Sequence, residues 1–428
     1  MTSSTLAAIL NDLSNLSSPR RVMPSTFTWL DYSEHERRKM LDVIDLFGEK
    51  TTRDELGLGG VRDAFADLLF PGTSTIQTRA RYFLFIPWIY LELEEKRTSS
   101  ARIGHRARKL ETELALAIAE SEDSAGLIGR RKKENIQRLP SNVYWQGLST
   151  WGIRVFPGSQ DEYHRSLDVF YARIRARRRS SHEYFGEAPE EADLNNWHPS
   201  VPSPPQGFPE DVSFALPHHE ADYLQKQVLL HCPQSLLAHL LREQVPVKRL
   251  DFVWQLTDLP EPLQAIVEHG QNFSEVMYGA QLLYNLMLAE TKSSSELVQH
   301  YESALEDWCG LITQRSAQLA TWDRQSFWRT VYRSNPRVSS RVRSFVDLWT
   351  NVALNTVTTT DLIESPQARQ LVKYREVQLK GGLARLHGGR PLEMWNGAAG
   401  AAQLDLRWKA ASGIAADIVA GLENGSNA

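Results

Sequence analysis

Arginine and lysine are the residues whose spacing points most directly to a chemistry in this sequence. Two dense basic runs, RRKK at 130–133 and RIRARRR at 173–179, lie in a segment, 129–185, with a net charge of +7. A second segment, 315–390, has a net charge of +8, which leaves −19 for the rest of a chain whose total is −4. Guanidinium and ammonium groups at this density suit a phosphate backbone. The alternative is that they form solvated helix faces or pair with the acidic remainder of the chain.

The second basic segment has a regular spacing. Arginine recurs every fourth residue from 329 to 341, and Pro336 interrupts the series, so two helices that meet at a corner would share one stripe. In the first segment, aromatic residues that could stack on bases lie between the basic runs, at Tyr144, Trp145, Trp151, Phe156, Tyr163, Phe170 and Tyr171. We therefore predict a surface that binds DNA or RNA, made of Arg130, Arg131, Lys132, Lys133, Arg173, Arg175, Arg177, Arg178, Arg179, Arg329, Arg333, Arg337 and Arg341.

A glycine-rich stretch near the C-terminus is a candidate anion-binding loop. It carries Arg385, His387 and Arg390, and its backbone amides could surround an anion. The alternative is a surface loop that packs Trp395 into a partner or into the core.

Most motifs of known enzymes are missing. There is no Walker A sequence, no Gly-x-Ser-x-Gly elbow and no His-x-Lys of the phospholipase D type. Four nominal metal ligands, His218, His219, His231 and Cys232, match no zinc pattern, and two cysteines exclude a disulfide framework. Two tripeptides, 94–96 (EEK) and 378–380 (QLK), match the tail of a restriction-type nuclease site and leave a metal-dependent nuclease open. We predict no catalytic residues, no metal and no cofactor.

Helical periodicity dominates the elements that must position these residues. We predict a helix over Ser33–Phe47, a short helix over 61–70, and a buried helix around 82–91 that is kinked at Pro87. Ser159 and Glu162 form a capping box, and Ser141 or Asn142 caps another helix. Alternating patterns are nearly absent, VTTT at 357–360 being the best. The fold is predicted to be mainly α and multi-helical, with two lobes joined by a proline-rich segment.

The length of 428 residues allows two or three domains. Six prolines between 189 and 209 place a boundary there, so we predict a flexible tail at 1–24, a helical domain at 25–185, a linker or long loop at 186–213 and a second helical domain at 214–428. A hydrophobic fraction of 42% excludes a mainly disordered chain. Because no apolar run is long enough to span a bilayer, we expect a cytoplasmic protein without membrane contact.

The N-terminal block resembles a family of uncharacterised bacterial proteins. The resemblance is dense over 27–90 and rests on Trp29-Leu-Asp31-Tyr, Gly60-Val-Arg62-Asp63 and the run from Phe70 to Phe83 that includes Arg79 and Arg81. The family is known as a domain of unknown function, encoded in defence islands beside helicases and phospholipase D-like nucleases. It implies a multi-gene anti-phage system but no catalytic residue.

Physically, the arginines of this block have two explanations. Arg62, Arg79 and Arg81 could form bidentate pairs with carboxylates, for which Asp31, Asp63 and Asp67 are candidates, or they could approach nucleic acid. Together these observations favour a non-enzymatic subunit or adaptor of a defence system that contacts DNA or RNA. The alternatives are a scaffold that docks a helicase or nuclease without touching DNA, and a cryptic metal-dependent nuclease.

Overall fold

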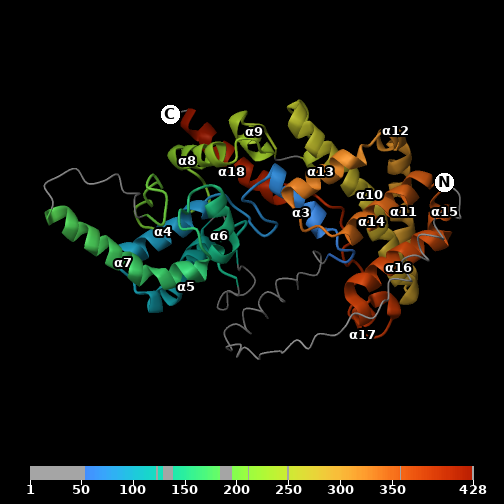
Figure 1. Cartoon of the computed structure of the whole chain (residues 1–428), viewed down its shortest axis with the longest axis horizontal. Coiled ribbons are helices and arrows are strands. Elements are labelled where there is room, and N and C mark those ends of the chain that lie inside the picture. Colours follow the sequence, from blue (N-terminus) through green and yellow to red (C-terminus); the bar gives the residue numbers. More distant parts are fainter. Residues whose placement is uncertain are drawn as a thin grey trace, which may run out of the picture. The chain divides into compact units, whose positions relative to one another are not determined.

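The computed structural model describes residues 54–121, 124–128, 138–183, 195–210, 212–247, 250–356 and 358–426, except the side chains of 178–183 and 425–426. They fall within one compact unit, residues 49–428. The described residues are mostly helical, and their only β feature is an isolated bridge between Arg154 and Trp197 (Figure 1). The mainly α prediction is confirmed. The expected tail and the expected helix over Ser33–Phe47 lie outside the described residues.

The most buried helix of the first half is α4, as its apolar run predicted. Every side chain from Tyr82 to Tyr90 is buried, Phe85 is fully inaccessible, and Pro87 lies inside the helix. The ring of Phe83 stacks on Trp151 with centroids 3.8 Å apart. The helices of this half are α3 (Gly59–Leu69), α4 (Tyr82–Glu95), α5 (Ser100–Glu120), α6 (Pro140–Thr150) and α7 (Gln160–Glu183).

One of the two expected helix caps is present. The Ser159 amide donates to the Glu162 carboxylate at 2.7 Å, and the Glu162 amide donates to the Ser159 hydroxyl at 3.2 Å, which confirms the capping box. The prediction that Ser141 or Asn142 caps α6 is wrong, because this helix begins at Pro140 and has no side-chain cap. Inside α6, the Ser141 hydroxyl donates instead to the buried carboxylate of Glu111 at 2.7 Å.

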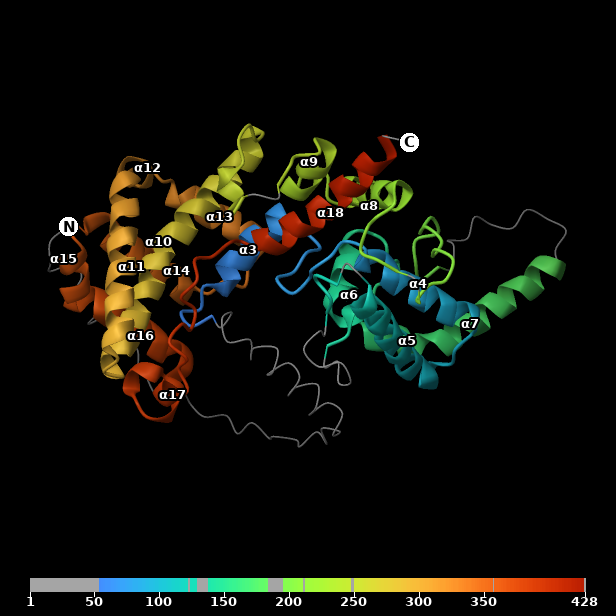
Figure 2. The same cartoon turned by 180° about the vertical axis from the view of Figure 1, so that it is seen from behind.

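The second half is organised around the long helix α10, against which α11, α14 and α16 pack (Figure 2). The described residues of VTTT, 358–360, do not form a strand; Thr358 caps α15 by accepting a hydrogen bond from the Asp361 amide. The remaining elements are α8 (His218–His231), α9 (Leu236–Arg242), η1 (Val253–Gln255), α10 (Glu261–Thr291), α11 (Ser295–Gln314), α12 (Ser316–Ala320), α13 (Arg324–Ser334), α14 (Ser340–Asn355), α15 (Thr359–Glu364), α16 (Pro366–Lys380), η2 (Gly381–Leu383), η3 (Arg385–His387), α17 (Arg390–Glu393) and α18 (Trp408–Ser426).

Ion pairs link the N-terminal block to distant parts of the chain. Arg81 forms a buried bidentate pair with Glu220, with both N···O distances 2.7 Å, and Arg79 pairs with Asp417 at 2.9 Å. Asp67 pairs with Arg407 at 2.7 Å. The ion-pair explanation is confirmed for all three arginines: Arg62 pairs with the candidate Asp63 at 2.9 Å, whereas Arg79 and Arg81 pair with carboxylates that were not candidates.

The described part of the proline-rich segment packs on α4. The Trp88 indole donates to the Pro202 carbonyl, and Phe208 contacts Trp88 edge to face. The division into two lobes at this segment stays a prediction. Within the described ranges, no helix combines the length and apolarity that a membrane crossing needs.

Candidate functional site

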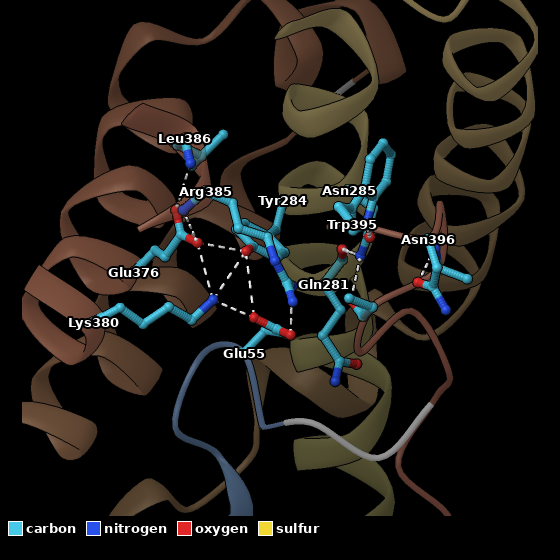
Figure 3. A network of polar contacts seen from close by, with 12 residues as sticks. Glu55, Gln281, Tyr284, Asn285, Glu376, Lys380, Arg385, Leu386, Trp395 and Asn396 are labelled. Atoms are coloured by element: carbon cyan, nitrogen blue, oxygen red, sulfur yellow. Dashed lines mark hydrogen bonds and ion pairs between the residues drawn. The ribbon is translucent and has the colours of Figure 1, made fainter. Parts of the chain in front are cut away.

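Three parts of the chain that are far apart in sequence meet in a network of buried and half-buried ionisable groups (Figure 3). Glu55 precedes α3, Tyr284 lies on α10, Glu376 and Lys380 are one turn apart on α16, and Arg385 opens η3. Tyr284 donates to Glu376 at 2.6 Å, and Lys380 donates to Glu376 at 2.9 Å and also to Glu55. Arg385 donates to the second oxygen of Glu55 at 2.6 Å. Two carboxylates therefore face two cations and one phenol.

The charges in this network hold one another in their ionised forms. Burial alone would raise the pKa of Glu376, but the Tyr284 hydroxyl and the Lys380 ammonium bring it below its ordinary value. Burial would lower the pKa of Arg385, and Glu55 outweighs that effect and raises it. Burial and the two carboxylates raise the pKa of Tyr284, which therefore stays a hydrogen-bond donor. The network is suited to fixing structure, since each charge has an internal partner.

The glycine-rich loop does surround an anion, and that anion belongs to the same chain. The amides of Arg385 and Leu386 donate to the Glu376 carboxylate at 2.9 and 3.1 Å. The Arg385 side chain is buried and points to Glu55, so neither its guanidinium nor its amide is available to a soluble anion. His387 and Arg390 are exposed, and anion binding by these two stays a prediction. Trp395 is buried, as the alternative for this loop expected.

The two tripeptides that suggested a nuclease end in lysines that pair with carboxylates of the same chain. Lys380 is in the network above, and Lys96 pairs with Glu92 on the same helix. Glu94 is half-buried and accepts hydrogen bonds from Asn196 and Trp197 at 3.0 and 3.2 Å. In the described parts of the chain, no three His, Cys, Asp or Glu side chains are grouped so that they could hold a metal ion.

The arginine stripe lies on the surface where α13 meets α14. Arg329 and Arg333 are on α13, Arg337 is in the connection, Arg341 is in the first turn of α14, and all four side chains are exposed. Arg329 is 76% exposed and approaches Asp323 at 4.0 Å. Among the described residues, the other three arginines form no ion pair. The corner expected at Pro336 is therefore present, and the stripe faces solvent.

The other basic run lies on the second half of α7. Arg173, Arg175 and Arg177 are exposed on this helix. Arg178 and Arg179 belong to the same helix, but their side chains lie outside the described set. Arg130, Arg131, Lys132 and Lys133 lie outside the described residues altogether.

The aromatic residues expected to stack on bases are part of the core. Tyr144, Trp151 and Tyr163 are fully buried, and Trp145 and Tyr171 are nearly so. The physical reason is that α6 and α7 pack these rings against α4, where Tyr90 contacts both Trp145 and Tyr163 edge to face. The basic segment 129–185 thus presents cations without the interleaved aromatic surface that the sequence suggested.

Sequence reasoning missed a third group of cations, on α5. Arg102, Arg106 and Lys109 are exposed and lie on one face, because residues spaced by four and three recur on the same side of a helix. The signal was present as the run RIGHRARK at 102–109. The net charge of the segment does not reveal this run, because acidic residues in the second half of the helix largely offset its cations.

Comparison with known proteins adds a family but no activity. A model described as a family of unknown function, DUF6361, matches residues 24–421. The chain belongs to the DUF6361 family. Neither a curated protein nor a solved structure matches the chain. The resemblance in the N-terminal block thus extends over nearly the whole length of this DUF6361 member.

Proposed function

We propose that this DUF6361 member is a non-enzymatic, nucleic-acid-associated subunit or adaptor of a bacterial anti-phage defence system. The observation that carries the proposal is the exposed arginine stripe of α13 and α14. The neighbourhood implied by the resemblance, beside helicases and phospholipase D-like nucleases, supports the defence context. A helicase or such a nuclease is the protein partner that we expect.

The stripe supports phosphate binding because its cations are not used inside the protein. Carboxylates of the interior are paired with a different set of arginines, as the Arg81–Glu220 and Arg385–Glu55 pairs illustrate. Arg333, Arg337 and Arg341, which form no ion pair among the described residues, repel one another, and a phosphate backbone relieves that repulsion while it releases condensed counterions. The alternative of solvated faces neutralised by internal acids therefore has less support for the stripe.

The test is removal of three arginines of the stripe. Arg333→Gln, Arg337→Gln and Arg341→Gln together should weaken binding to labelled DNA or RNA, measured by fluorescence anisotropy at 50 mM salt. Each lost phosphate contact weakens binding by roughly eightfold at 0.1 M salt, so at that salt concentration the triple variant should bind on the order of 500-fold less tightly. The slope of log K against log salt should fall by about 3.

A matched control removes the same formal charge elsewhere. Lys226→Gln, Arg242→Gln and Lys409→Gln replace three exposed cations of α8, α9 and α18. If the stripe itself binds nucleic acid, this control should change the affinity by no more than about threefold, since it lowers the net charge equally but leaves the stripe intact. Equal losses in the two variants, or no binding by the unaltered protein at 50 mM salt, would contradict the proposal and favour a scaffold that does not touch nucleic acid.

A further inference from the structure

The described side chains of α7 beyond Tyr171, those of residues 172–177, are not part of the buried core. The side chains of Tyr163, Leu167 and Tyr171 are buried, and they are spaced as one stripe of a helix. Beyond Tyr171 no described side chain of this helix is buried. The first residue of α5, Ser100, hydrogen-bonds to Asp168, so the residues of α7 that follow extend past the end of the helix on which α7 packs (Figures 1 and 2).

The arginines on this extension point to opposite sides. Successive helical residues turn by about 100°, so Arg173 and Arg177 lie about 40° apart while Arg175 lies on the other side of the axis. The three side chains cannot all contact one flat ligand surface, because at least one of them would face away from it. It suits a ligand that encloses the helix between two negatively charged walls.

We propose that the C-terminal half of α7 inserts into the major groove of duplex DNA. A helix with its side chains is about 10–12 Å wide, and the major groove of B-form DNA is about 12 Å wide, with a phosphate backbone on each wall. Arg173 would contact one backbone and Arg175 the other. This inference rests on the proposed function, which it deepens by naming the form of the nucleic acid and the element that reads it.

Duplex DNA fits this element better than the other nucleic acids. A-form RNA has a deep and narrow major groove that a helix cannot enter. Binding of single strands depends on exposed aromatic rings. On α7, Tyr171 is buried and Phe170 half-buried, and no other described residue of its second half is aromatic.

The neighbouring helix provides a flank for the same ligand. α5 runs antiparallel to α7, since Ser100 hydrogen-bonds to Asp168 and Gly104 lies against the ring of His164. Its exposed face carries Arg102, Arg106 and Lys109, described above. These cations would track the backbone next to the groove that α7 occupies, which adds affinity without sequence preference.

Chemical protection of DNA tests the geometry on the unaltered protein. Dimethyl sulfate methylates guanine N7 in the major groove and adenine N3 in the minor groove. The full chain bound to a 30-base-pair duplex should protect guanine N7 and leave adenine N3 reactive. Affinity should be at least tenfold higher for duplex DNA than for duplex RNA or a single strand of equal length. Protection of adenine alone, or equal affinity for duplex RNA, would overturn the inference.

A variant connects the protection to α7. Arg173→Gln with Arg175→Gln should abolish N7 protection and weaken duplex binding about 60-fold at 0.1 M salt. Helix content should stay constant, because Gln and Arg have similar helix propensities and both positions are exposed. Lys226→Gln with Arg242→Gln is the matched control and should leave protection intact.

The possible outcomes separate this inference from the proposed function. If the stripe variant loses binding while the α7 variant retains full N7 protection, the proposed function stands and the major-groove inference is wrong. If the unaltered protein binds no nucleic acid, both are wrong. If oligoglutamate displaces the duplex at equal charge concentration, α7 recognises acidic polymers in general, which overturns the inference in favour of an acidic protein partner.

Discussion

Removing one side of the Arg81–Glu220 pair should destabilise the protein far more than replacing both sides. The guanidinium and the carboxylate are 6% and 2% exposed and share two hydrogen bonds of 2.7 Å, and Arg81 also donates to the Ser213 carbonyl. A buried charge left without its partner costs about 3–5 kcal/mol. We therefore expect Arg81→Met and Glu220→Leu each to lower the free energy of unfolding by that amount.

The double variant should be much closer to the unaltered protein. With both charges gone, the desolvation penalty disappears, and an apolar pair of similar volume is often neutral or stabilising. We expect the double variant to lie within about 2 kcal/mol of the original, so the interaction energy from the cycle is several kcal/mol. Tryptophan fluorescence during urea unfolding, with linear extrapolation to water, measures all four proteins.

An exposed pair supplies the control for this cycle. Lys226 and Asp222 approach within 2.7 Å on α8, but their side chains are 69% and 34% exposed. Replacing them by Met and Leu in the same design should give an interaction energy below about 0.5 kcal/mol. Additive losses at Arg81 and Glu220, or single losses under about 1 kcal/mol, would show that the pair is not the buried electrostatic link described here.

Two further predictions concern the first half of the chain. Burial raises the pKa of Glu111 to about 7. Because the folded state then holds a proton that the unfolded state releases, the free energy of unfolding should fall by about 3 kcal/mol as pH rises from 4.5 to 7. Glu111→Gln should remove most of this pH dependence, measured by urea titrations. An unchanged pH dependence in the variant would assign it to another group. Phe85→Ala should cost about 3–5 kcal/mol, since its ring is inaccessible and contacts Trp88 and Phe214. A loss below 1 kcal/mol in the same unfolding assay would contradict that.

Local rules predicted the elements of this fold well, and long-range contacts explain the errors. The capping box at Ser159 and the buried helix around Phe85 depend on residues a few positions apart, and both are present. Serine is a residue type that often caps helices, but the Ser141 hydroxyl donates a hydrogen bond to Glu111, a carboxylate 30 residues away. Periodicity cannot show such a partner.

The same limit applies to the candidate site. The arginines at 329–341 could be predicted as exposed, because their four-residue spacing defines one face without reference to the rest of the chain. The burial of Arg385 could not be predicted, since it depends on Glu55, which lies 330 residues earlier. The aromatic residues of 144–171 are ambiguous in sequence, because a ring among cations fits either a stacking surface or a core.

The long span of these ion pairs has a consequence for how the protein is made. Glu55 and Asp67 leave the ribosome early, while Arg385 and Arg407 are synthesised 330 and 340 residues later. At about 5–20 residues per second, the two acids wait on the order of 15–70 s for their cations. During that time Glu55, which is buried in the complete fold, lacks the cations that make its burial favourable. A chain that terminates before residue 385 never completes the network. Premature termination should therefore leave an N-terminal block that is exposed to solvent and sensitive to proteases, and not a stable fragment.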